Sequence, residues 1–376
     1  MKQGAEFFDC CKKAEKLLIL APSSYLGGLY THLVVAELGN RFPSLKLTAI
    51  DDVWFADPLK APRNVDVLPI SALASGELRG TPSINCSYSL ATWLTFRQAS
   101  VQAGNVHFDL PEVLYALDLP LVYQSGSVTR RETLEHLAEF ETVRDRLADD
   151  LSRATLDAIL RFRMDGNRGA LLDILSSGEQ EYFSFYRGGD HPIRLGEEEC
   201  YIDIGAYDGD TVRKFLTAVR HEYNSIHAFE PDPTNFDAMR RSLGEDTPRL
   251  VLHNQAVSDC RGTLSFAAKG NMGSRAEVGG GVQVPCIRLD DELEWATLIK
   301  MDVEGHEPEV LRGGSGLIAR CKPRLAITCY HHALDLLAII SVLDQIQPGA
   351  RLYLRHYSMF FYDTILYVDW LPPVET

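Results

Sequence analysis

Short runs of apolar residues alternate with longer amphipathic segments along much of the chain. The first run, at residues 17–21 (LLILA), is followed at 29–38 by apolar residues that recur at helical spacing. Two more short runs, at 45–50 and 65–70, give the order strand, helix, strand, strand. A second alternation of strands and helices starts at residue 199. This pattern predicts an α/β fold in both halves of the chain.

The chain changes character twice, which predicts three parts. Residues 131–163 are rich in Glu, Arg, Leu and Ala with apolar residues at helical spacing, and they predict two helices. Glycines then interrupt the passage at 166–189. We therefore expect a smaller N-terminal Rossmann-like α/β domain at 1–125, a helical arm or linker at 126–195, and a second α/β domain at 196–376. A length of 376 residues fits two domains, because single cores stop growing at about 250–300 residues.

Composition and charge narrow the classes of partner. The chain has 37 basic and 52 acidic residues, a formal net charge of -15 that repels a nucleic acid backbone. It has no run of the roughly 20 apolar residues that a membrane span requires, so we expect no membrane insertion. Residues 1–16 lack the apolar core of a signal peptide, which predicts a cytoplasmic protein. The eight cysteines lack the spaced pairs of a zinc site.

The second α/β segment opens with a turn that is rich in both glycine and aspartate. Residues 200–204 (CYIDI) have the pattern of a buried strand, and residues 205–211 (GAYDGDT) that of a tight turn before a helix. A phosphate loop would carry Lys followed by Ser or Thr, whereas this turn carries Asp208 and Asp210, which also repel the pyrophosphate of NAD. A ligand that suits these carboxylates is cationic or rich in hydroxyls. S-adenosylmethionine has a sulfonium, an ammonium group and a ribose diol, so we expect it to be the cofactor.

An acid follows the next predicted strand. Residues 225–229 end at Glu230, about twenty residues beyond the turn, where a carboxylate can accept hydrogen bonds from both ribose hydroxyls. The loop after the third strand, at 255–259, falls where adenine would lie in such a sheet. The residues that we assign to the cofactor are Asp203, Gly205, Ala206, Tyr207, Asp208, Gly209, Glu230, Pro231, Ala256 and Asp302.

A further polar group follows the fourth and fifth strands of this domain. Strand 298–301 is followed by Asp302 and Glu304, and strand 324–328 by the run Tyr-His-His at 330–332. The run at 302–307 also contains His306 and Glu307, and three carboxylates and an imidazole within six residues are costly to cluster unless a cation, a metal or a proton transfer uses them. Asp302 and Glu304 could alternatively hold a divalent metal, because oxygen ligands suit magnesium and calcium. Two carboxylates are a weak metal signal, so we assign no metal ion.

These motifs, taken in order, resemble the FkbM-type family of S-adenosylmethionine-dependent methyltransferases. The resemblance is carried by residues 203–211 (DIGAYDGDT), 229–231 (FEP), 256–259 (AVSD) and 299–307 (IKMDVEGHE), and it extends over about residues 150–370. It implies a class I methyltransferase fold, with a seven-stranded, mostly parallel sheet whose last strand is antiparallel. It also implies O-methylation, commonly of a sugar or polyketide hydroxyl. The N-terminal domain lies outside the resemblance.

An alcohol acceptor must lose its proton when it is methylated, so the site needs a base. Histidine is the natural candidate near neutral pH, and we expect His331 to be the base, with His306 and Asp302 as alternatives. Packing or helix capping explains either histidine equally well. Arg355 lies at the end of a later strand, at 351–355, and could hold a charged acceptor such as a uronic acid or a phosphosugar; pairing with nearby acids explains it equally well. The residues that we assign to the acceptor are Glu304, Tyr330, His332 and Arg355.

Two alternatives stay open in the sequence. The first is a cofactor-binding or scaffold protein that keeps the methyltransferase fold without its chemistry. An intact Glu230 argues against such decay, because unused buried carboxylates reduce stability. The second concerns the N-terminal domain, which we expect to serve either recognition of a small-molecule or glycan acceptor or formation of a homodimer.

Overall fold

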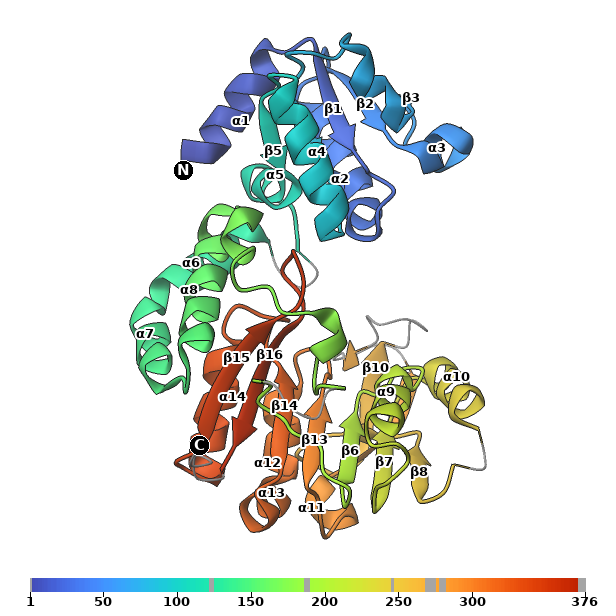
Figure 1. Cartoon of the computed structure of the whole chain (residues 1–376), viewed down its shortest axis with the longest axis vertical. Helices are drawn as coiled ribbons and strands as arrows, with labels where there is room; N and C mark the ends of the chain where they lie inside the picture. Colours follow the sequence, from blue (N-terminus) through green and yellow to red (C-terminus); the bar gives the residue numbers. More distant parts are fainter. Residues whose placement is uncertain are drawn as a thin grey trace. The chain divides into compact units, whose positions relative to one another are not determined.

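A computed structural model describes residues 2–121, 125–185, 190–244, 247–267, 275–276 and 282–370 (Figure 1). The chain forms two compact units, and each is described by itself. The first unit comprises residues 1–135 and 157–173, and the second comprises residues 136–156 and 174–376.

The first unit is built on a five-stranded sheet whose strands all run parallel. Its strands are β1 (Lys16–Leu20), β2 (Lys46–Ile50), β3 (Val65–Leu68), β4 (Ser83–Asn85) and β5 (His107–Asp109), and its helices are α1 (Lys2–Lys13), α2 (Tyr25–Arg41), α3 (Asp52–Ala56), α4 (Leu90–Gln102), α5 (Leu110–Leu117) and α6 (Gly126–Glu135). The strand order is β3-β2-β1-β4-β5, with β1 at the centre. This confirms the predicted N-terminal α/β fold.

The second unit contains a seven-stranded sheet and a smaller four-stranded sheet. The large sheet contains β6 (Cys200–Ile204), β7 (Ser225–Phe229), β8 (Leu250–His253), β13 (Leu298–Met301), β14 (Arg324–Thr328), β15 (Arg351–His356) and β16 (Thr364–Asp369). Its order is β15-β16-β14-β13-β6-β7-β8, and only β16 is antiparallel to the other strands. This confirms the predicted mostly parallel sheet with an antiparallel last strand. The small sheet contains β9 (Ala256–Val257), β10 (Gly262–Ala267), β11 (Arg275–Ala276) and β12 (Val282–Ile287).

Helices connect the strands of the large sheet. They are α9 (Asp210–Ala218), α10 (Pro233–Leu243), α11 (Leu289–Glu292), α12 (Glu307–Gly313), α13 (Ser315–Cys321) and α14 (Asp335–Ile346). Helix α9 packs on α10, while α12, α13 and α14 pack on one another (Figure 1). The central strands β13 and β14 are almost wholly buried, because a parallel sheet covered by helices excludes water from both faces. Their short continuous apolar runs follow from this environment.

The structure divides the segment at 126–195, which the sequence assigns to one helical arm, between the two units. It contains α6, α7 (Leu137–Arg146) and α8 (Asp150–Asp165), one helix more than the pattern predicts. In the second unit, Asp149 pairs with Arg355 on β15, at 2.6 Å between oxygen and nitrogen. In the first unit, the buried guanidinium of Arg168 donates to the carbonyl of Asn85 and to the carboxylate of Asp109, at 2.8 and 2.9 Å. These partners lie far away in the sequence, so helical spacing alone does not show the division.

None of the helices in the described part of the chain combines the length and apolar composition needed to cross a bilayer. All eight cysteines fall within the described ranges, and all eight are free thiols.

Candidate active site

The carboxyl ends of four neighbouring strands meet at one edge of the large sheet, in the order β14, β13, β6, β7. A cavity lies at this edge, which is where open α/β sheets bind their ligands. Its lining residues are Glu181, Tyr182, Ile204, Gly205, Tyr207, Asp210, Thr211, Phe229, Glu230, Pro231, Asn235, Gln255, Ala256, Val257, Leu264, Lys300, Asp302, Val303, Glu304, His306, Tyr330 and Asp363. The predicted strand ends therefore converge on one site.

The turn between β6 and α9 is held by the strands on either side of it. The backbone N–H groups of Gly205 and Ala206 both donate to the carbonyl of Phe229, at 3.0 Å. On the other side, a β-carbon at Gly205 would lie 1.8 Å from the carbonyl oxygen of Asp302. Gly205 also has φ of +79°, a conformation that favours glycine. The first glycine of the motif therefore lets β13 approach β6 closely.

Gly205→Ala is expected to destabilise the protein and to weaken cofactor binding, because the new methyl group overlaps the backbone of Asp302. The matched control is Gly349→Ala, since Gly349 has φ of +87° and no atom within 4 Å of an added β-carbon. We expect the control to lose about 1–2 kcal/mol from backbone strain alone, and Gly205→Ala to lose about 1–3 kcal/mol more from overpacking. Urea unfolding measures the difference, and equal losses would contradict the close approach.

Glu230 lies at the end of β7 and lines the cavity, as predicted. Its carboxylate accepts backbone hydrogen bonds from Tyr207 at 2.9 Å and from Asp232 at 2.8 Å, which fix its orientation. Burial raises the pKa of the Glu230 carboxyl to about 7. A buried carboxylate held open towards a cavity is suited to accept hydroxyl hydrogen bonds, because these favour its charged form.

Other residues assigned to the cofactor support the turn instead of lining the cavity. The Oδ1 atom of Asp203 lies 3.1 Å from Nζ of Lys300, and the Oδ2 atom of Asp203 accepts from the hydroxyl of Tyr201 at 3.0 Å. Asp208 pairs with Arg213 at 3.1 Å and accepts from the backbone of Asp210. The cavity lining includes Gly205, Tyr207, Glu230, Pro231, Ala256 and Asp302, and does not include Asp203, Ala206, Asp208 or Gly209 among the described residues.

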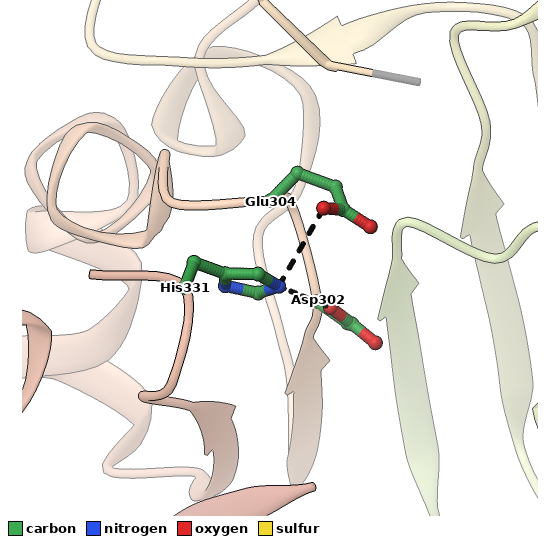
Figure 2. A group of neighbouring side chains, drawn as sticks. All are labelled: Asp302, Glu304 and His331. Atoms are coloured by element: carbon green, nitrogen blue, oxygen red, sulfur yellow. Dashed lines mark ion pairs between the residues drawn. The ribbon is translucent and has the colours of Figure 1, made fainter. Parts of the chain in front are cut away.

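Three side chains from the ends of β13 and β14 come together at the other end of the cavity. The Nε2 atom of His331 lies 3.5 Å from Oδ1 of Asp302 and 3.7 Å from Oε2 of Glu304. Figure 2 shows the imidazole edge directed at both carboxylates. The sequence analysis assigned these three residues to the ends of two different strands, and the structure places them in one group.

His331 is almost fully buried behind the two carboxylates that line the cavity. Its Nδ1 atom lies 3.4 Å from Oε1 of Glu307, which has no exposed surface. Burial alone would lower the pKa of His331, but the charge and hydrogen bond of Glu307, with the charges of Asp302 and Glu304, raise it to about 10. This raised pKa favours the protonated ring at neutral pH, and a protonated ring cannot accept a proton from an acceptor hydroxyl.

The sequence analysis assigned the role of base to His331, but Glu304 has the properties that this role requires. It lines the cavity, and burial raises the pKa of its carboxyl to about 7, close to the working pH. Its backbone has φ of +60°, and Gly305 follows with φ of +94°. A β-carbon at Gly305 would lie 2.4 Å from the ring of His332, so this tight turn requires glycine. Strained backbone of this kind is frequent where a side chain is held for function.

The same three side chains, Asp302, Glu304 and His331, could also bind a metal ion. One ligand atom from each of Asp302, Glu304 and His331 lies within 4.8 Å of the others, a spacing that a divalent ion could bridge. A metal-binding imidazole must give up its proton, however, and the pKa of His331 is raised to about 10. A divalent ion and this proton would therefore compete for the same group of side chains.

The remaining predicted residues have different surroundings. His306 lines the cavity, with its Nε2 atom 2.8 Å from the hydroxyl of Ser258. Tyr330 also lines it, with its ring 4.2 Å from that of His331. His332 and Arg355 do not line it among the described residues. His332 pairs with Asp335 at 3.2 Å, and the buried Arg355 forms the ion pair with Asp149.

The lining residues that the sequence did not assign to the site include Glu181, Tyr182, Lys300 and Asp363. The hydroxyl of Tyr182 donates to Oδ2 of Asp302 at 2.9 Å, although 120 residues separate them. Asp363 precedes β16, which runs antiparallel beside β14 and therefore begins at the edge where β14 ends. Both residues have positive φ, of +63°, which the sequence does not reveal at a tyrosine or an aspartate.

Comparison with known proteins gives a family match and named relatives. A family model described as methyltransferase FkbM domain matches residues 203–347. The 2-O-methyltransferase NoeI of Sinorhizobium fredii is 29% identical, over 40% of this chain and 73% of the relative. The hexuronic acid methyltransferase AglP of Haloferax volcanii is also 29% identical, over 34% of this chain and 56% of the relative. The chain thus matches just over half the length of AglP.

A solved structure extends the likeness to nearly the whole chain. The crystal structure of methyltransferase FkbM from Methylobacillus flagellatus KT has a TM-score of 0.76 with this protein at 21% sequence identity. The match covers 97% of this chain and 93% of that chain, so the shared fold includes the N-terminal α/β unit. At this identity the likeness concerns the fold alone.

Proposed function

We propose, from the match of residues 203–347 to the FkbM methyltransferase domain, that the protein transfers a methyl group from S-adenosylmethionine to a hydroxyl oxygen. The acceptor in this proposal is a sugar or glycan, or a secondary metabolite. The printed names of two relatives, a 2-O-methyltransferase and a hexuronic acid methyltransferase, support sugar O-methylation. The observation that carries the proposal is Glu230, a buried carboxylate beside the glycine turn and open to the cavity.

The residues at one end of the cavity fit the proposed cofactor. Glu230 would hold the ribose hydroxyls, and the turn at Gly205 and Tyr207 would hold the methionine part. Ala256 and Leu264 belong to the small sheet beside this end and would contact adenine. When bound, S-adenosylmethionine supplies the methyl group as an activated sulfonium. Its positive charge suits a cavity lined by carboxylates.

The residues at the other end fit proton removal from an acceptor. Glu304 would accept the hydroxyl proton as the oxygen forms its new bond to the methyl carbon, because its carboxyl has a pKa of about 7. Asp302 is held between the hydroxyl of Tyr182 and the ring of His331, and would orient the acceptor hydroxyl. His331, protonated and buried, is a positioning residue that balances the charge of both carboxylates. The reaction proposed for Glu304 needs no further cofactor.

Calorimetric titration with S-adenosylmethionine tests the cofactor assignment. We expect Glu230→Ala to weaken binding by at least about tenfold to a hundredfold, because hydrogen bonds to a charged group contribute about 1.5–3 kcal/mol. The matched control Glu222→Gln removes an exposed carboxylate outside the cavity and should bind as the wild type does. Unchanged affinity in Glu230→Ala would contradict the ribose assignment, and binding of NAD in its place would contradict the proposed function.

Methyl transfer distinguishes an enzyme from a cofactor-binding scaffold. We expect purified protein to transfer labelled methyl groups from S-adenosylmethionine to hydroxyl acceptors in a glycan extract, with a mass increase of one methylene group on the product. Tight binding of S-adenosylmethionine without transfer to any acceptor would favour the scaffold.

A further inference from the structure

The charge of the cavity walls limits the charge that an acceptor can carry. This inference rests on the proposed function and goes beyond it. Carboxyl groups dominate the lining: they belong to Glu181, Asp210, Glu230, Asp302, Glu304 and Asp363. Among the described residues, the basic side chains of the lining are Lys300 and His306. Acids therefore outnumber bases by a wide margin inside a partly closed space, where charges interact more strongly than in water.

The nearby cations already have partners within the protein. Lys300 is buried, lies 3.1 Å from Asp203 and donates to the carbonyl of Gly205 at 2.6 Å. His306 lies 2.8 Å from the hydroxyl of Ser258 and 3.6 Å from Glu309. The sequence suggested that Arg355 could hold a charged acceptor, but Arg355 is paired with Asp149 outside the cavity lining. Two further cations lie beside the lining: Lys214 on α9 donates to the carbonyl of Glu181 at 2.5 Å, and His331 lies 3.5 Å from Asp302 and 3.7 Å from Glu304. Within the described residues, each of these cations contacts an internal partner.

Two of the carboxyl groups belong to the end of the cavity assigned to the acceptor. Glu230 and Asp210 lie on the β6 and β7 side, which the cofactor would occupy. Asp363 instead precedes β16 next to the end of β14, and Glu181 precedes Tyr182, whose hydroxyl donates to Asp302. Glu181 and Asp363 thus join the wall that also contains Glu304. An acceptor hydroxyl that reaches Glu304 must approach this wall.

We propose that the acceptor carries no carboxylate or phosphate close to the hydroxyl that is methylated, and that Glu181 and Asp363 set this preference. Placing a like charge beside a partly buried carboxylate is strongly unfavourable. An ammonium group has the opposite effect, so an amine-bearing acceptor binds more tightly than its neutral analogue. This acceptor class differs from the hexuronic acid in the name of AglP.

The ionisation of the two carboxyl groups agrees with this preference. Burial and the charge of Asp363 raise the pKa of Glu181 to about 8. Burial and the charge of Asp302 raise the pKa of Asp363 to about 6. A pKa of about 8 leaves Glu181 mostly protonated at neutral pH, while Asp363 is mostly ionised. An incoming anion is therefore repelled by Asp363, whereas an ammonium group would also favour the ionised form of Glu181.

Matched sugar probes test the inference on the full-length protein saturated with S-adenosylhomocysteine. The probes are methyl glucoside, its 2-amino analogue and methyl glucuronide, whose dissociation constants are measured by saturation-transfer NMR. We expect the amino probe to bind about tenfold more tightly than the glucuronide, a difference of about 1.4 kcal/mol, with the glucoside between them. In the double variant Glu181→Gln/Asp363→Asn the preference should fall to less than about threefold. The control Glu141→Gln/Glu222→Gln removes two exposed carboxylates of the same unit and should keep it.

Each other outcome overturns the inference. Equal binding of the amino and glucuronide probes, or binding of none, shows that the wall does not select acceptor charge. A preference that persists in the double variant removes Glu181 and Asp363 as its cause. Binding of the glucuronide only after magnesium is added shows that a metal ion at the acidic wall sets the charge. Failure of the proposed function is recognised separately, because S-adenosylmethionine and S-adenosylhomocysteine would then not bind in the calorimeter.

Discussion

Glu304→Gln is expected to lower the turnover of methyl transfer by about 10²–10⁴-fold, the usual contribution of a general base. Its side chain lines the cavity, and burial raises the pKa of its carboxyl to about 7. Glutamine keeps the shape of this side chain but cannot accept the hydroxyl proton. We expect the affinity for S-adenosylmethionine to change by less than about threefold, because Glu304 lies at the acceptor end. Single-turnover transfer followed by mass spectrometry separates the two quantities.

The pH dependence of the same reaction identifies the base independently. A base acts in its deprotonated form, so wild-type turnover should rise with pH through about 7 as the Glu304 carboxyl ionises. This rise should be absent in Glu304→Gln and present in the exposed control Glu222→Gln. If Glu304→Gln keeps its turnover while Asp302→Asn loses it, Asp302 is the base.

The cavity-lining residues of the proposed cofactor end could be predicted because they lie in continuous segments of sequence. The turn at 205–211 and Glu230 each follow directly on a buried strand, and parallel strands bring their carboxyl ends to one edge. The acids of the turn nevertheless differ in role. Asp203 is on β6 and pairs with Lys300 beneath the turn, since alternate residues of a strand face opposite sides. The spacing of the motif identified the turn without showing which side chains face the ligand.

The proposed base, Glu304, did not follow from the sequence, because the pKa values of the candidate bases depend on partners from other segments. His331 and the acids at 302–307 were both recognised, and histidine has the ordinary pKa closest to neutrality. Their contact in the structure leads us to propose Glu304 in place of His331: Glu307 helps to raise the pKa of His331 to about 10, while burial raises the pKa of Glu304 to about 7. Glu181 and Asp363 were missed for a similar reason, since neither is close in sequence to another residue of the site.

The sequence pattern at the N-terminus is that of an amphipathic helix, although no helix is predicted there. Residues 2–13 form α1, a helix that the predicted elements do not include. Phe7 and Cys11 are buried four residues apart on one face, while Glu6 and Lys12 are exposed. This is the spacing of an amphipathic helix. By contrast, the short strands β4 and β5 have three residues each and give too little periodicity to predict.

His331→Ala is expected to destabilise the second unit by about 3–5 kcal/mol, because removing one partner leaves a buried charge without compensation. Glu307 has no exposed surface and faces the ring of His331 at 3.4 Å. The loss should depend on pH in a defined direction. A histidine whose folded pKa is raised stabilises the fold fully below its unfolded value of 6.5, and this contribution disappears as pH rises towards about 10. Urea unfolding at pH 6 and pH 9.5, followed by circular dichroism, measures it.

A second substitution at Glu307 separates a charge effect from a cavity effect. If the loss in His331→Ala comes from the uncompensated carboxylate, His331→Ala/Glu307→Gln should recover part of it, because the neutral amide still accepts from Val303 and Thr328. A loss caused by the missing ring volume would instead be the same in both variants and at both pH values. That outcome would mean that the ring of His331 is neutral, and it would return histidine to the list of candidate bases.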